Sequence, residues 1–187
     1  MIKLLATLYI VFVPMISHPN EITIHNAHTE IKNGLLMLPV ESSLPLTVEA
    51  DLPLADEVID ALKSGISIEF ELEIRLIKSR KYWFDETVFS TRRRYAVARH
   101  ALSERFVVTD LITGQPRTFN SLKVMLASAG KLKDIPITDE DILEPNLRGA
   151  VRLYLDIGAL PSPMLPLAYF SPGWHISSEW YEWHIPL

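Results

Sequence analysis

The sequence predicts a mainly β (α+β) protein, an antiparallel β-sandwich-like domain with two short helices. Three observations predict it. Residues 66–77 alternate apolar and polar side chains without interruption, several other strand-like stretches are separated by turn signals, and only two stretches combine helical periodicity with end signals. The 187 residues are 48% hydrophobic and 22% charged, which suits one domain with one core, over residues 19–187.

The first elements expected are strands at about residues 21–31 and 35–40. Asn33–Gly34 between them favours a type I′ hairpin turn. Pro39 and Pro45 predict an edge position or an irregular connection for the segment that carries them.

Two helices are predicted, each from an apolar stripe and end signals. The first covers 51–65, with Asp51 as its cap and Gly65 at its end. The second covers 120–130, with Asn120 as its cap and Gly130 at its end.

The long strands follow the first helix. Residues 66–77, 87–101 and 104–112 are expected to be strands, with a connection at 79–86. A hairpin centred near Trp83 would place Glu73 opposite Arg93 and Glu71 opposite Tyr95, with Arg92 and Arg94 pointing inward or to a second layer. Beyond the second helix we expect an acidic turn at 138–145, a strand at 148–157, a proline-rich connection at 161–173 and a final strand at 176–185.

The N-terminus suggests export. Residues 4–16 form a thirteen-residue apolar run after Lys3, the length of a signal-peptide hydrophobic region and short for a membrane-spanning helix. We therefore expect a signal peptide over 1–18, with an uncleaved anchor as the alternative, and an exported protein that is periplasmic or anchored at the outer side of the inner membrane.

Composition and motifs exclude several function classes. The chain lacks cysteine, which excludes disulfides and thiol chemistry, and its formal charge of −5 argues against nucleic-acid binding. The usual nucleotide-binding, zinc-protease and serine-hydrolase motifs do not occur. His25 and His28 are three apart on a strand, and His100 has no partner placed beside it by the sequence, so no catalytic residue, metal site or cofactor is predicted.

Two residue groups could bind a ligand. Glu69, Glu71 and Glu73 share one strand face at spacings that permit acid/base work, although a solvated face balanced by arginine is the simpler interpretation. The other group is aromatic and basic, and a core role for its tryptophans remains the alternative to binding; its members are Trp83, Arg92, Arg94, Trp174, Trp180 and Trp183.

Three motifs together resemble an exported bacterial family, domain of unknown function number 4390, also described as proline-rich signal peptide proteins. They are KYWFDE at 81–86, RRYAVARHALSERFVV at 93–108, and the stretch 155–185 with its Leu-Pro-x-Pro and W-x-x-S-S-x-W spacing. The resemblance implies no activity, cofactor or catalytic residue. It implies secretion or membrane association, and for some members of the family a genomic neighbour that is a membrane sensor kinase.

Two functions are therefore expected as alternatives. The first is a non-enzymatic periplasmic domain that binds an envelope or membrane protein, with a sensor kinase suggested by the family alone. The second is an envelope hydrolase or carbohydrate-binding module that uses the Glu69/Glu71/Glu73 face. A buried, partnerless glutamate in a cleft would favour the second function.

Overall fold

The computed structural model describes residues 21–32, 35–43, 53–129, 131–139 and 146–185. The protein is mainly β, and its antiparallel sheets with helices confirm the predicted sandwich-like α+β class. The predicted signal segment 1–18 lies outside the described residues. No helix among the described residues is both long and apolar enough to cross a membrane.

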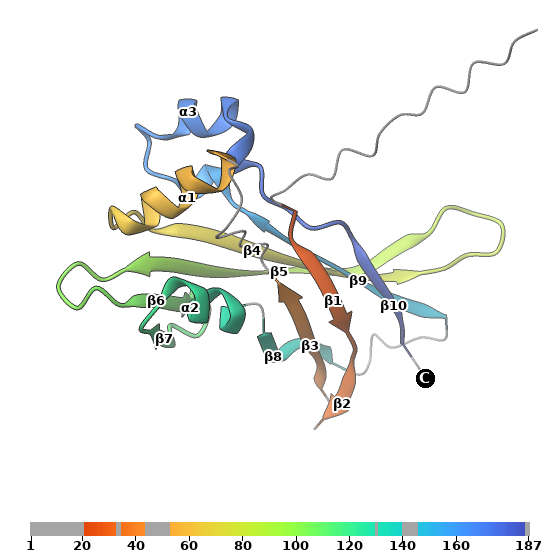
Figure 1. The fold of residues 1–187 in the computed structure, drawn as a ribbon. Helices are drawn as coiled ribbons and strands as arrows, with labels where there is room; N and C mark the ends of the chain where they lie inside the picture. The colour runs from red at the N-terminus through yellow and green to blue at the C-terminus, as the bar shows by residue number, and fades with distance from the viewer. Residues whose placement is uncertain (1–20, 33–34, 44–52, 130, 140–145, 186–187) are drawn as a thin grey trace, which may run out of the picture.

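One sheet has six antiparallel strands in the order β10-β9-β4-β5-β6-β7 (Figure 1). Its strands are β4 (Ile68–Lys78), β5 (Glu86–Arg99), β6 (Phe106–Asp110), β7 (Pro116–Phe119), β9 (Leu147–Leu155) and β10 (Tyr181–His184). The two longest strands, β4 and β5, form a hairpin that extends past its neighbours at the right of Figure 1.

The second sheet contains β1 (Thr23–Ala27), β2 (Glu30–Lys32), β3 (Leu35–Ser43) and β8 (Lys131–Asp139). The antiparallel pairing of β2 with β3 supports the predicted hairpin, although its turn residues 33–34 lie outside the described residues. Pro39 lies in β3, which has partners on both sides, rather than at an edge. Pro39 falls where the pairing of β3 with β8 shifts register. Regular strand pairing is interrupted there, so the N–H that proline lacks is not needed for an inter-strand hydrogen bond.

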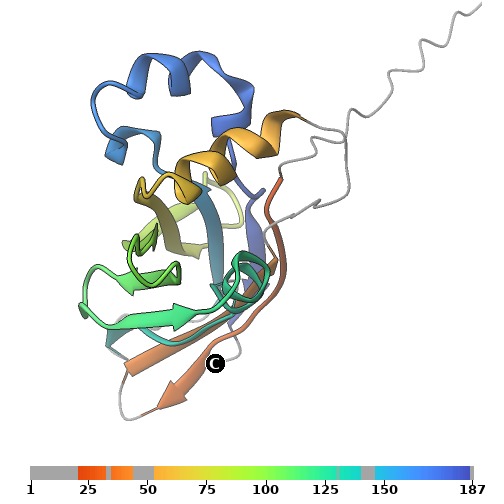
Figure 2. The same ribbon diagram turned by 60° about the vertical axis from the view of Figure 1, so that its left-hand side comes forward.

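The core lies between the two sheets. Ile74, Leu76 and Val151 from the long sheet and Ile24 and Leu132 from the second sheet belong to one buried cluster. Strand β1 also approaches the last segment of the chain, where Ile22 donates its backbone N–H to the carbonyl of Ser177. Figure 2 shows the second sheet packed across the long one.

Helix α1 (Pro53–Lys63) and helix α2 (Leu122–Ala129) are the two predicted helices; α1 ends before the predicted Gly65 and α2 begins after the predicted Asn120. Val58 and Leu62 of α1 and Met125 of α2 are buried, as the predicted stripes require. The proposed caps Asp51 and Gly130 lie outside the described residues. The side chain that caps α2 is Ser121 rather than Asn120, because the Ser121 Oγ accepts from the N–H of Val124 at 3.3 Å.

Three further elements were not predicted. Strand β7 follows β6, strand β8 includes the first residues of the expected acidic turn, and a third helix, α3 (Leu165–Phe170), interrupts the proline-rich connection. Short 3₁₀ turns at Ile157–Ala159 (η2) and Pro172–Trp174 (η3) flank α3. In Figures 1 and 2, α3 lies above α1 and away from the second sheet.

Candidate functional site

The register of the β4–β5 hairpin differs from the predicted one by a single residue. Glu73 pairs with Arg92 and Glu71 with Arg94, while Arg93 pairs with Leu72. Cross-strand partners share a face, so Arg92 and Arg94 lie on the glutamate face and Arg93 on the opposite face. The predicted inward orientation of Arg92 and Arg94 is therefore wrong, as is the predicted pairing of Glu73 with Arg93.

Glu73 is the most buried charged residue described, with 1% of its surface exposed. Arg75 binds its Oε1 through Nε at 3.0 Å and Nη2 at 2.5 Å. Arg152, directly opposite on β9, binds its Oε2 through Nε at 2.9 Å and Nη2 at 2.7 Å. Each carboxylate oxygen therefore accepts two charge-assisted hydrogen bonds from one guanidinium.

Trp180 covers this carboxylate cluster. Its indole ring lies 4.4 Å from the guanidinium carbon of Arg75 and 4.7 Å from that of Arg152. Burial raises the pKa of Glu73, but the hydrogen bonds and charges of the two arginines outweigh it, so its pKa is lowered overall. Glu73 is consequently held as a carboxylate.

Glu71 is engaged in the same way by different partners. Its Oε1 accepts from the hydroxyl of Tyr154 and lies 3.3 Å from the Nε of Arg92. Burial, and then the bond to Glu71, raises the pKa of Tyr154 to about 12. Glu71 itself is 7% exposed, so the face predicted to be solvated is largely covered.

Protein side chains therefore bind the carboxylates of both Glu71 and Glu73. Acid or base catalysis needs a carboxyl group within hydrogen-bond reach of a substrate, and Glu71 and Glu73 are already occupied by protein donors. The Oε2 of Glu69 is buried and has no partner among the described residues. A shallow cavity of about 380 Å³ lies elsewhere, at the sheet end near Arg148 and Trp183, and none of the three glutamates lines it.

The three C-terminal tryptophans have separate environments. Trp174, in η3, is 2% exposed and belongs to the core, so it offers no surface to a partner. Trp183 lies over Gly149 of β9, which it pairs with, and its Nε1 donates to the Thr29 hydroxyl at 3.4 Å. Together with Trp180 on its arginines, these side chains pack against the protein itself.

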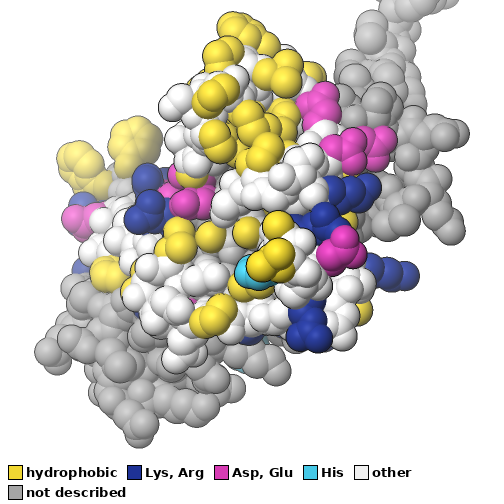
Figure 3. Space-filling model, turned by 90° about the vertical axis from the view of Figure 1, so that its left-hand side faces the viewer, with side chains coloured by type: hydrophobic (Ala, Val, Ile, Leu, Met, Phe, Trp, Pro, Cys, Tyr) yellow, Lys and Arg dark blue, Asp and Glu magenta, His cyan; other side chains and the backbone are white. Residues whose placement is uncertain are grey.

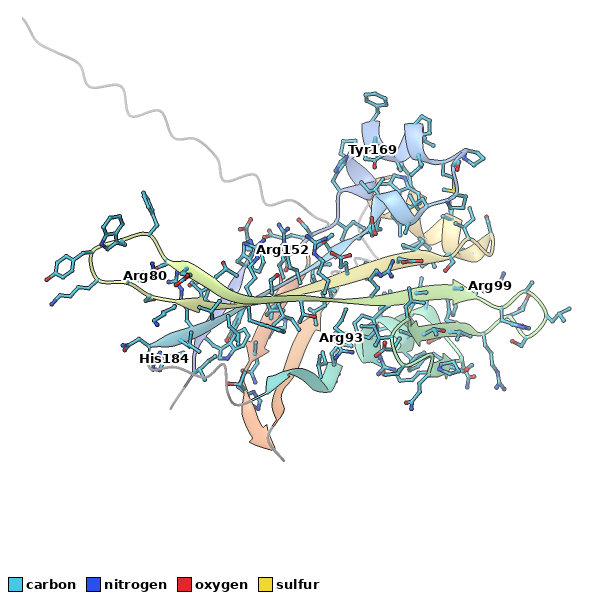
Figure 4. The ribbon with its side chains drawn as sticks, turned by 180° about the vertical axis from the view of Figure 1, so that it is seen from behind. Arg80, Arg93, Arg99, Arg152, Tyr169 and His184 are labelled. Atoms are coloured by element: carbon cyan, nitrogen blue, oxygen red, sulfur yellow. The ribbon has the colours of Figure 1, made fainter. Side chains whose placement is uncertain are left out.

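Trp83 is the one predicted tryptophan that is largely exposed, at 79%. It lies between Tyr82 and Phe84, which are 82% and 94% exposed, in the turn that joins β4 to β5. We call these three residues the aromatic tip. Figure 4 shows ring side chains projecting from the hairpin end beyond the labelled Arg80.

A second apolar surface, which the sequence did not reveal, lies on α3. Leu167, Tyr169 and Phe170 are 66%, 55% and 89% exposed, and we call them the α3 surface. Figure 3 shows hydrophobic side chains gathered at the top of the molecule, where α3 lies. The signal that would have located it is Pro166 in the first turn of a short helix, a position where proline is common.

Contacts on the other side of α3 attach the α3 surface to the rest of the protein. Ala168 on the opposite side of the helix is buried, and the Ser171 hydroxyl at its end donates to Glu57 Oε2 of α1 at 2.7 Å. The His175 Nε2 lies 3.1 Å from the carbonyl of Tyr169. Buried Trp174 follows directly, next to α1, so the exposed rings project from an anchored base.

The histidines are not part of a metal-binding cluster in the described residues. No three His, Asp or Glu side chains converge there. His100 does have a hydroxyl beside it, since its Nδ1 lies 3.2 Å from the Ser103 Oγ, but both groups are exposed in the β5–β6 turn.

The fold and these surfaces define an antiparallel sandwich-like domain with a cluster of buried glutamates paired to half-buried arginines, and with two exposed apolar surfaces. Comparison with known families assigns it further: DUF4390, a domain of unknown function, matches residues 21–184, and the chain belongs to this family. No curated protein and no solved structure matches the chain significantly.

Proposed function

We propose that this protein is a non-enzymatic domain of the bacterial envelope that binds another envelope protein through its α3 surface. The single observation that carries the proposal is the exposure of Leu167, Tyr169 and Phe170 on a proline-flanked helix whose Ala168 is buried. Exposed aromatic residues on a fixed base are typical of protein-binding surfaces, because they bury much area at little cost in conformational entropy.

The hydrolase or carbohydrate-binding alternative has weaker support. Two of its three candidate carboxylates, Glu71 and Glu73, are occupied by arginine and tyrosine, and Trp180, which would stack on a sugar, instead stacks on two guanidinium groups. A substrate would first have to break these contacts. The third, Glu69, has a buried Oε2 without a partner among the described residues, but it does not line the cavity near Arg148.

Export rests on the apolar run at residues 4–16. Cell fractionation, followed by N-terminal sequencing of the mature protein, tests it. Recovery of the intact chain in the cytoplasm would overturn this part of the proposal.

The partner is sought by cross-linking in cells and purification of the tagged full-length chain from the envelope. The proposal expects one reproducible envelope protein, which is lost in the Leu167→Ser/Phe170→Ser variant. The matched control is Val124→Ser, which removes a side chain that is 57% exposed on α2 and should retain the partner.

Purified partner and chain should then bind each other directly. The extracytoplasmic part of a membrane sensor kinase is the first protein to test, on family analogy alone. Equal recovery of the partner with the α3 variant and with the Val124→Ser control would contradict the proposed surface.

A further inference from the structure

The aromatic tip, Tyr82, Trp83 and Phe84, is the most exposed set of large apolar side chains among the described residues. Three successive rings on the surface are costly to leave in water, since burying an aromatic side chain contributes about 1.5–3 kcal/mol. The core cluster does not include them. We therefore expect these rings to be buried by a surface that does not belong to the described residues.

The hairpin holds the tip in place. Strands β4 and β5 pair continuously down to Lys78 and Glu86, with one bulge. Arg80 and Glu86 then form an ion pair across the hairpin end, and Asp85 forms another with Arg148 of β9. The rings consequently project from a braced turn, and little conformational entropy is lost when they are buried.

The charges around the tip suit a membrane surface. Its two neighbouring carboxylates, Asp85 and Glu86, are each neutralised by an arginine. Lys81 extends beside the rings, with its ammonium 5.6 Å from the centre of the Tyr82 ring. Aromatic rings next to a lysine resemble the side chains found at the boundary between lipid headgroups and acyl chains.

Shape also favours a lipid surface over a folded partner. The tip is a projecting turn at the end of the long hairpin, beyond the neighbouring strands β9 and β10 (Figure 1). A fluid bilayer accepts such a projection without a complementary pocket, whereas a folded partner has to provide one.

We propose that the aromatic tip of the β4–β5 hairpin inserts into the headgroup region of a phospholipid bilayer, with Lys81 at the level of the lipid phosphates. This binding site is separate from the α3 surface, which lies toward the other end of the long sheet (Figures 1 and 4). It goes beyond the proposed protein–protein function and does not depend on it.

The test uses the full-length chain and vesicles of phosphatidylcholine and phosphatidylglycerol that carry bromine on their acyl chains. Bromine quenches tryptophan emission at close range, and Trp83 is far more exposed than the other three tryptophans. We expect quenching of the wild-type protein that is largely absent in Trp83→Phe. The difference between these two proteins reports Trp83 alone, whatever other segment touches the vesicles.

Two further variants test the cause. Tyr82→Ser/Phe84→Ser keeps Trp83, and the lipid concentration at half-maximal quenching should rise about tenfold or more, because two rings are lost. Leu102→Ser is the matched control, since Leu102 is 93% exposed in the β5–β6 turn, and it should leave the titration unchanged.

Equal quenching of the wild-type protein and Trp83→Phe would overturn the proposal, because Trp83 would then remain in water. An equal shift in the Tyr82→Ser/Phe84→Ser and Leu102→Ser variants would also overturn it, since any exposed apolar residue would then suffice. Both tip variants should still bind the soluble part of the envelope partner as the wild-type protein does, so this proposal and the proposed function can fail separately.

Discussion

Replacement of Gly149 by alanine should loosen the edge of the long sheet through one side chain, Trp183. A Cβ built on Gly149 would lie closer than 3.0 Å to three carbons of the Trp183 six-membered ring. Carbon atoms in contact prefer about 3.5–4.0 Å, so the ring has to move away by about 1.5 Å or more. Gly149 itself is held by pairing to Leu76 on one side and Trp183 on the other, so the backbone cannot retreat in its place.

The magnitude follows from two opposing effects. Overpacking at a well-packed site costs about 1–3 kcal/mol, and the fixed backbone places Gly149→Ala near the upper end, at about 3 kcal/mol. Replacement of glycine also reduces the conformational entropy of the unfolded chain, which stabilises the folded state by about 0.4–1 kcal/mol. The expected loss in the free energy of unfolding is therefore about 2 kcal/mol, or a fall of about 4–8 °C in Tm.

Urea denaturation followed by circular dichroism measures this loss, and a double-mutant cycle with Trp183→Ala identifies its cause. In the Trp183→Ala background the added methyl group has room, so Gly149→Ala should cost almost nothing there. The same cost in both backgrounds would refute the reasoning, because the clash with the indole would then not be its source.

Three other substitutions test the buried and half-buried side chains Glu73, Tyr154 and Trp174. Glu73→Gln should lower the free energy of unfolding by about 2 kcal/mol, as measured by chemical denaturation. This is less than the loss expected on breaking a fully buried ion pair, because Arg75 and Arg152 are each 37% exposed. The lowered pKa of Glu73 stabilises the folded state above about pH 4.5, and this contribution is lost as the pH falls through the folded-state value, so Glu73→Gln should unfold with a weaker acid dependence. The pKa of Tyr154, raised from 10.0 to about 12, stabilises the folded state below pH 10 and this is lost as the pH rises to about 12, so Tyr154→Phe should flatten alkaline unfolding curves between these values. Trp174→Ala should cost about 3–5 kcal/mol in urea denaturation, because the side chain is 2% exposed; a cost below about 1 kcal/mol would contradict its core position.

The strands with strong alternation could be predicted from sequence because the period of two alone identifies their apolar face. In β4 the residues Ile68 to Leu76 at alternate positions are buried as the period of two requires. The fate of the opposite face depended on Trp180, more than one hundred residues away, which covers the arginines of Glu73. No local pattern indicates that contact, so the glutamate face was expected to be solvated.

The register of the hairpin shows how a small error changes a site. The predicted pairing assumed a turn centred at Trp83, but the turn is centred one residue earlier and a register shift lies between Leu76 and Ile77. Because side chains alternate, one residue of slip exchanges the faces of every arginine on β5. Arg92 was therefore expected to point inward and instead lies at Glu71. Whether Arg92 or Arg94 binds a ligand stays a prediction.

Helix α3 escaped prediction for a different reason. Six residues are too few for a helix to form on propensity alone, and the surrounding prolines favour irregular structure. Its stability comes from tertiary contacts, chiefly buried Ala168 and the bond from Ser171 to α1. A helix that exists because of its packing can be recognised only once the elements that it packs against are placed.

The two exposed apolar surfaces lie toward opposite ends of the long sheet, and this separation gives the proposals a joint consequence (Figure 1). With the aromatic tip in a bilayer, the braced β4–β5 hairpin acts as a spacer and α3 points away from the lipid. A partner bound there would have to extend above the membrane surface, as the extracytoplasmic part of a membrane protein does. On this geometry Tyr82→Ser/Phe84→Ser should weaken the partner complex only when the partner is embedded in vesicles, and leave binding to its soluble part unchanged, whereas Leu167→Ser/Phe170→Ser should weaken both.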